Sequence, residues 1–142
     1  MKKEKSTNIV FPSLKWAEKL CKRVNKDRYL REIGKGFNEN IAIIVNVSAA
    51  QKRALVFQIN DGECINVTYL DKLNEIRNDW DLVLEADMDT WIKILRLETT
   101  PTKALFTRKL KIIKGNKLMI FSRPLAHYQI LYIASKLYEE LE

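Results

Sequence analysis

The chain has few of the residues on which catalytic and metal sites depend. It contains one histidine, His127, and two cysteines, Cys21 and Cys64, among 142 residues. This set has neither the ligand number nor the spacing of a zinc site. The chain also lacks a Gly-x-Ser-x-Gly turn, and Gly34-Lys35-Gly36 lacks the further glycine and hydroxyl residue of a phosphate-binding loop. Nothing here argues for an enzyme, and we expect no cofactor and no metal.

Long hydrophobic runs are also absent. An α-helix needs about 20 apolar residues to cross a bilayer, whereas the longest candidate run covers residues 130–134. The basic start is followed by no apolar stretch of the kind found in secretory leaders. We therefore expect a cytoplasmic protein in which both cysteines stay reduced.

The composition is that of one globular domain. Apolar residues make up 46% of the chain and charged residues 30%, which is enough for a real core in a chain of this length. No internal repeat and no low-complexity linker divides it. We expect residues 1–10 to form a disordered basic tail and residues 11–142 to form a single domain.

Positive charge is concentrated at the N-terminal end. Residues 1–36 contain 11 Lys/Arg and 4 Asp/Glu, which gives +7, and residues 37–142 contain 14 of each. Such a segment can attract anionic membrane headgroups or nucleic acid. It can equally be the solvated face of an ordinary helix. Because no RNA-binding strand motif, zinc finger or helix-turn-helix accompanies it, we expect no nucleic-acid partner.

Hydrophobic periodicity predicts two helical pieces followed by three strands. Apolar residues at helical spacing over 14–24 predict a helix capped by Ser13, and a second short piece covers 29–33. The period then changes to two. It predicts an antiparallel meander of three strands over 41–47, 54–60 and 63–70, with Asn60-Asp61-Gly62 as a hairpin turn.

The second half of the chain alternates strands and helices. Residues 71–79 are polar and predict a flexible connection. The elements that follow are a strand over 81–87, a helix over 90–97 capped by Asp89, a Pro-led helix from 101 and a strand over 108–114.

The last predicted helix, over residues 125–141, has no polar face in its middle. A helix of this kind must be covered on several sides. Three arrangements satisfy that need: a central place in the fold, a wall of a ligand cavity, or an interface with a second subunit.

Residues 86–116 carry a motif in three parts. They are Ala86-Asp87-Met88-Asp89-Thr90-Trp91, then Pro101-Thr102-Lys103-Ala104-Leu105-Phe106, then Arg108-Lys109-Leu110-Lys111-Ile112-Ile113-Lys114-Gly115-Asn116. This motif resembles the acidic strand end, short helix and following strand of the sterol carrier protein type 2 family. Phe11-Pro12-Ser13 and Trp16 support the resemblance, which spans about residues 11–135.

The resemblance implies an α+β fold, a five-stranded mixed sheet covered by helices. It also implies an apolar tunnel between sheet and helices that binds a lipid: a fatty acyl chain, acyl-CoA or a sterol-like molecule. Leu97 and Arg108 depart from the family, which often has glycine at the first position and usually at the second. Since glycine is the residue that permits unusual backbone angles, we expect the turn before the fifth strand to differ.

The resemblance and the apolar faces together give a candidate lipid site. We expect the tunnel to be lined by Trp91, Leu95, Phe106, Ile113, Met119, Phe121, Tyr128, Leu131 and Tyr132. The alternative is that these side chains fill the core, and that the protein is a dimerisation or interaction module without a ligand. The expected partners are an apolar lipid, an anionic membrane met by the basic N-terminal helix, and a second copy of the chain met by the C-terminal helix.

Overall fold

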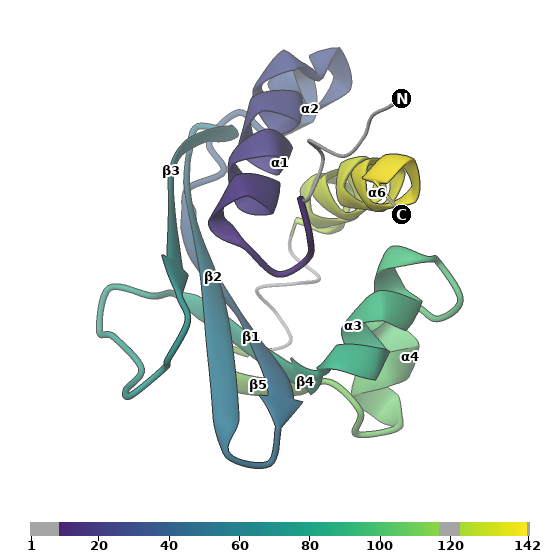
Figure 1. Cartoon of the computed structure of the whole chain (residues 1–142). Helices are drawn as coiled ribbons and strands as arrows, with labels where there is room; N and C mark the ends of the chain where they lie inside the picture. The colour runs from purple at the N-terminus through teal and green to yellow at the C-terminus, as the bar shows by residue number, and fades with distance from the viewer. Residues whose placement is uncertain (1–8, 117–122, 142) are drawn as a thin grey trace.

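A five-stranded mixed sheet forms the frame of the protein (Figure 1). The computed structural model describes residues 9–116 and 123–141. The strand order is β3-β2-β1-β4-β5. β1 and β4 run parallel, and the other neighbouring pairs are antiparallel. The strands are β1 (Glu39–Ser48), β2 (Gln51–Asn60), β3 (Glu63–Leu70), β4 (Leu82–Asp87) and β5 (Lys111–Lys114).

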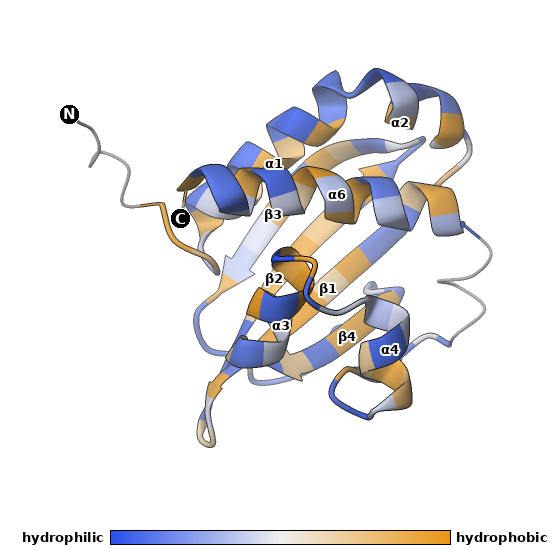
Figure 2. Cartoon of the chain, turned by 90° about the vertical axis from the view of Figure 1, so that its right-hand side faces the viewer, coloured by the Kyte–Doolittle hydropathy of each residue, from blue (hydrophilic) through white to orange (hydrophobic). Residues whose placement is uncertain are grey.

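The helices lie on one face of this sheet (Figure 1). They are α1 (Leu14–Lys26), α2 (Arg28–Ile33), α3 (Met88–Leu95), α4 (Pro101–Phe106) and α6 (Pro124–Leu141). The strands beneath them contain many hydrophobic residues (Figure 2), and Ile41, Phe57 and Leu82 are buried in the same core cluster as residues of the helices. The predicted α+β class, the meander and the helix-covered sheet are therefore confirmed.

The opposite face of the sheet is covered by the segment between β3 and β4. Trp80 is buried there against Ala42, Ile44 and Val83, and Leu73 and Ile76 pack beside it. The polar sequence of residues 71–79 predicted a flexible connection. In the structure this segment supplies apolar side chains to a second layer of core, so it closes the back of the sheet.

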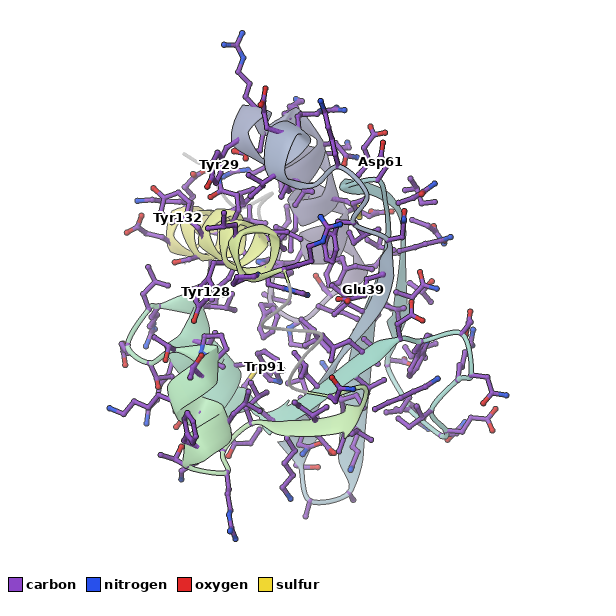
Figure 3. The ribbon with its side chains drawn as sticks, turned by 180° about the vertical axis from the view of Figure 1, so that it is seen from behind. Tyr29, Glu39, Asp61, Trp91, Tyr128 and Tyr132 are labelled. Atoms are coloured by element: carbon purple, nitrogen blue, oxygen red, sulfur yellow. A yellow bond between two sulfur atoms is a disulfide. The ribbon has the colours of Figure 1, made fainter. Side chains whose placement is uncertain are left out.

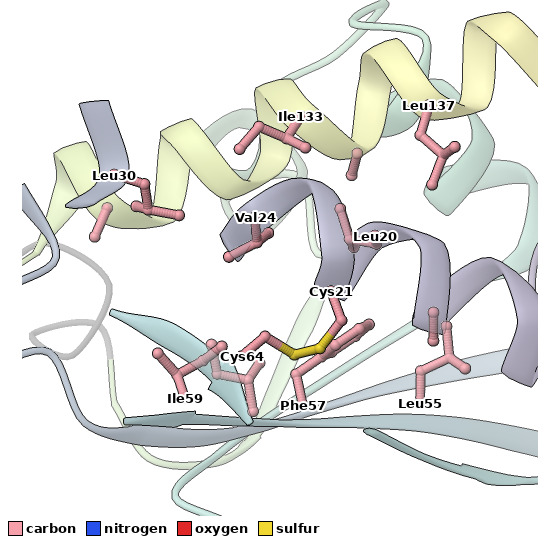
Figure 4. Packing of buried hydrophobic residues seen from close by; sticks show 14 of the residues in the cluster. Leu20, Cys21, Val24, Leu30, Leu55, Phe57, Ile59, Cys64, Ile133 and Leu137 are labelled. Carbon is pink, nitrogen blue, oxygen red and sulfur yellow. A yellow bond between two sulfur atoms is a disulfide. The ribbon is translucent and has the colours of Figure 1, made fainter. Parts of the chain in front are cut away.

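α1 is attached to the edge strand β3 by a covalent bond and two hydrogen bonds. Cys21 and Cys64 form a disulfide with 5.3 Å between their Cα atoms (Figure 4). The Asn25 side-chain amide donates to the Cys64 carbonyl oxygen at 2.9 Å and accepts from the Cys64 N–H at 2.8 Å. The prediction of reduced cysteines is therefore wrong, because the docking of α1 on β3 brings together two residues that lie 43 positions apart.

Several predicted boundaries shift by a few residues. Ser13 caps α1 as expected, since its side chain accepts from the Trp16 N–H at 3.1 Å. α3 begins at Met88 and is capped by Asp87, not by Asp89. β5 begins at Lys111. The predicted tail lies outside the described residues except for positions 9 and 10, and Ile9 packs against the core.

We predict that loss of the disulfide destabilises the fold substantially. A bridge that closes a loop of this length restricts the unfolded chain by about 4 kcal/mol in the chain-entropy treatment. The double substitution Cys21→Ser/Cys64→Ser should lower the free energy of unfolding in urea by about 2–4 kcal/mol. Dithiothreitol, which reaches the buried bridge once the chain unfolds in urea, should do the same to the wild type and nothing further to the variant. Equal midpoints for all samples would contradict the bridge.

Leu97 and Arg108 both adopt left-handed backbone angles, with φ of 60° and 63°. At these two positions the resemblance implies glycine, and the backbone adopts the conformation that glycine favours. A residue with a Cβ atom loses about 1–2 kcal/mol there, while glycine loses more entropy on folding.

Leu97→Gly and Arg108→Gly should each raise the free energy of unfolding by about 0.5–1 kcal/mol. The measurement is thermal or urea unfolding. Leu97→Ala is the matched control, because it removes the side chain and keeps the Cβ atom. If the glycine and alanine variants were equally stable, strain at this position would be ruled out.

Candidate functional site

An apolar cavity of about 150 Å³ lies between the sheet and the helices. Ile41, Phe57 and Leu82 form its floor on the sheet, and α1, α3 and α6 form its walls. Among the described residues of the lining there is no Asp, Glu, Lys or Arg, and the polar side chains belong to Thr102, His127 and Tyr128. The cavity therefore accommodates uncharged, apolar groups.

Trp91 is the wall of the cavity that α3 supplies. Its indole N–H donates to the Ile44 carbonyl oxygen at 2.9 Å, and the residue is buried. The same helix is held at its start by Asp87, whose carboxylate accepts from the Thr90 N–H at 2.8 Å. α3 is therefore fixed to β4 through its cap residue Asp87 and to β1 through the Trp91 indole.

His127 fixes the start of α6. Its Nε2 lies 2.9 Å from a carboxylate oxygen of Glu39, and its Nδ1 lies 2.9 Å from the Arg123 carbonyl oxygen. The Phe37 ring meets the imidazole edge to face at 5.1 Å. Both ring nitrogens are occupied by protein groups, so this histidine positions the helix at the cavity rather than offering a free base.

A second hollow lies on the outer side of α6. This outer groove has a volume of about 360 Å³ and lies between α2, the segment that joins α3 to α4, and α6. Figure 3 shows three of its tyrosines, Tyr29, Tyr132 and Tyr128, along one side of the molecule. The groove shares Pro101, Tyr128 and Leu131 with the cavity lining.

The boundary between cavity and groove includes a contact between α4 and α6. The hydroxyls of Thr102 and Tyr128 lie 3.3 Å apart, and both side chains are exposed enough to meet solvent. Leu131 and Pro101 complete the boundary. The separation of the two hollows is thus one layer of side chains thick.

The structure brings five of the nine predicted site residues to these hollows. Trp91, Leu95, Tyr128 and Leu131 line the cavity, and Tyr132 lines the outer groove. Met119 and Phe121 lie outside the described residues. The sequence reasoning missed the walls that come from α1 and from the sheet, among them Trp16, Leu20, Val24 and Phe57. The apolar face of the first helix and the alternation of the second strand were the signals for them.

Phe106 and Ile113 lie away from both hollows, although the sequence placed them in the tunnel. Phe106 is 76% exposed and Ile113 is 44% exposed. α4 buries Ala104 instead, and the register of β5 turns Ile112 toward the core. These two side chains therefore contribute to the surface and not to the cavity.

The acidic group formed by Glu85, Asp87 and Asp89 is accounted for by local contacts. Glu85 forms an ion pair with Lys52, Asp87 caps α3, and Asp89 pairs with Lys93 at 3.3 Å. Burial tends to raise the pKa of Glu85, but hydrogen bonds from Lys52 and Asn46 outweigh it and the pKa is lowered. Within residues 9–116 and 123–141, no group of three or more His, Cys, Asp or Glu could hold a metal ion. No helix in the same ranges could cross a membrane.

Comparisons with known proteins agree with this geometry. The SCP-2 sterol transfer family matches residues 17–120. A search of curated proteins finds no significant match. Among solved structures, the chain is similar to a sterol carrier protein 2 (21% identity, TM-score 0.79, covering 89% of this chain and 98% of that one). It is also similar to TT1886 of Thermus thermophilus, described as possibly a sterol carrier protein. The identity is 22% and the TM-score 0.78, and the match covers 91% of this chain and 90% of that one.

A third similar structure is the palmitated SCP2L2 of Aedes aegypti. It is 13% identical, with a TM-score of 0.51, and the match covers 84% of this chain and 95% of that one. At these identities the solved structures establish the fold. The family match covers all five strands, α2, α3, α4 and most of α1, and it ends before α6.

Removal of the α3 cap should weaken the fold in a pH-dependent way. Hydrogen bonds from the backbone and side chain of Thr90 hold the pKa of Asp87 below its ordinary value. A carboxylate with a lowered pKa stabilises the folded state above its unfolded pKa of about 3.9, and this stabilisation is lost as the pH falls through the folded pKa.

Asp87→Ala should therefore lose about 1 kcal/mol of unfolding free energy at pH 7, and the difference from the wild type should shrink below about pH 4. Urea unfolding at several pH values measures this. Asp87→Asn is the control, since asparagine also caps helices but does not titrate. A deficit of Asp87→Ala that stayed constant down to about pH 2 would show that the charge has no part in the cap.

Proposed function

We propose, from the premise that the chain belongs to the SCP-2 sterol transfer family, that it is a non-catalytic carrier of a lipid. The apolar chain of the lipid would occupy the cavity between sheet and helices. The observation that carries this proposal is the cavity itself, which is predominantly apolar, has no charged Asp, Glu, Lys or Arg among the described lining residues, and is walled by Trp91, Leu95 and Leu131. The palmitated SCP2L2 among the similar structures favours a fatty acyl chain as the ligand.

The physical basis of binding is the burial of methylene groups. Each contributes about 0.8 kcal/mol when it leaves water. Because no charged side chain among the described residues lines the cavity, an ionised headgroup would lose its hydration there without a counter-charge. The headgroup therefore stays outside and the hydrocarbon end enters first.

Contact with an anionic membrane is part of the same proposal. Lys15, Lys19, Lys22 and Lys26 are exposed on α1. Each cation near such a surface contributes about 1 kcal/mol. The apolar face of α1 is buried in the core, with Trp16, Leu20 and Val24 inside it. The helix would consequently meet the membrane through charge and not through insertion.

A cytoplasmic location also belongs to this proposal. Disulfides are uncommon in the cytoplasm, so the Cys21–Cys64 bridge is the feature that argues against this location. Both cysteines are buried, which limits the access of soluble reductants. Measuring free thiols in protein taken directly from cells would test the location and the bridge together.

Dimerisation through α6 is the second candidate function. It is favoured by the exposure of Leu125, Tyr128 and Tyr132 on this one helix. In that case the side chains around the cavity would be core residues and no lipid would bind. A concentration-dependent dimer in sedimentation, combined with no lipid binding, would favour this candidate over the carrier.

A variant that fills the cavity should lose lipid binding and keep its fold. Ala134 is buried and lines the cavity, so the ring in Ala134→Phe has space to enter. We expect at least about a tenfold lower affinity for a fluorescent fatty acid such as cis-parinaric acid. The free energy of unfolding should fall by no more than about 3 kcal/mol, as for other enlarged core residues.

Glu139→Phe is the matched control, because it adds the same ring at an exposed position of the same helix. It should bind like the wild type. If the wild type bound no cis-parinaric acid, and native mass spectrometry after mild purification detected no lipid, the carrier function would be rejected.

A further inference from the structure

We propose that the outer groove is the second compartment of the lipid site. It would take the part of a long, single-chain fatty acid that the cavity cannot hold, with the carboxylate at its outer end. This inference rests on the proposed function, because it presumes that an acyl chain enters the cavity.

The first argument is size. A cavity of about 150 Å³ is as large as the engineered cavity that admits one benzene molecule. Sites for small molecules typically measure about 300–1,000 Å³. The outer groove adds about 360 Å³, and the two hollows together fall within that range. A long acyl chain therefore needs both.

The second argument is continuity. Pro101, Tyr128 and Leu131 belong to the lining of both hollows. The Thr102–Tyr128 contact that bridges α4 and α6 at this boundary is a single hydrogen bond of 3.3 Å between hydroxyls. Because such a bond contributes only about 1 kcal/mol net, the part of the boundary that Tyr128 forms can open at little cost.

The third argument is the chemistry of the groove wall. Leu97, Leu125 and Tyr132 expose between 50% and 58% of their surface in this one groove. Large apolar side chains gathered in a single surface hollow mark a binding site more often than scattered ones do. The Lys136 ammonium lies 5.6 Å from the centre of the Tyr132 ring. The same ammonium lies 3.8 Å from a carboxylate oxygen of Glu139, so the carboxylate of a fatty acid that emerges from the cavity would compete with Glu139 for this cation.

The test compares fatty acids of different length on groove variants. Leu125→Ser/Tyr132→Ser changes two exposed residues that line the groove but not the cavity, so the fold should be kept. Ile65→Ser is the matched control, since Ile65 is 52% exposed on β3 and lines neither hollow. Isothermal titration with octanoate, laurate and palmitate measures each affinity.

In the wild type the affinity should rise by up to about fourfold for each added methylene, from octanoate to palmitate. The double variant should bind octanoate like the wild type and palmitate at least about tenfold more weakly, while Ile65→Ser should bind both like the wild type.

Two results would overturn the second compartment and leave the carrier function intact: an unchanged palmitate affinity in the double variant, or an equal loss for octanoate and palmitate. Failure of the wild type to bind any of the three acids would instead reject the carrier function, and the second compartment with it.

Discussion

The fold depends on the attachment of two helices to the sheet at separate places. The Cys21–Cys64 bond and the Asn25 amide hold α1 on the edge strand β3. The Trp91 indole holds α3 on β1 at the other side. α6 packs on α1, α2 and α3 and so lies over the space between the two attachments (Figures 1 and 4). The cavity lies between these two attached helices and α6, with residues of all three helices in its lining.

The parts of the fold that follow from local chemistry could be read from the sequence. Alternation of period two and the Asn60-Asp61-Gly62 turn predicted the meander, and Ser13 predicted the start of α1. The disulfide could not be read in this way. Its formation depends on which strand α1 crosses, and helical periodicity shows which face of a helix is apolar without showing what that face meets.

The candidate site was partly predictable for the same reason. Trp91 and Leu95 lie on the buried face of a helix that has a clear polar side, so their inward direction followed from spacing. Phe106 sits on a helix of six residues, and Ile113 on a strand of four residues. A shift of one residue reverses the direction of a side chain on a strand and turns it by about 100° on a helix. In elements this short the sequence alone does not set the register.

The all-round apolar character of α6 is explained by two different environments. Ile133, Ala134 and Leu137 face the core, while Tyr128 and Tyr132 face the groove and solvent. Tyrosine suits the second environment because its ring packs against hydrocarbon while its hydroxyl can remain hydrated. Leucine or phenylalanine at these positions would expose more apolar surface whenever the groove is empty. A helix with tyrosines on its outer face can therefore border a compartment that alternates between water and lipid. The proposed carrier function needs such a compartment, whereas a protein with a permanently filled core does not.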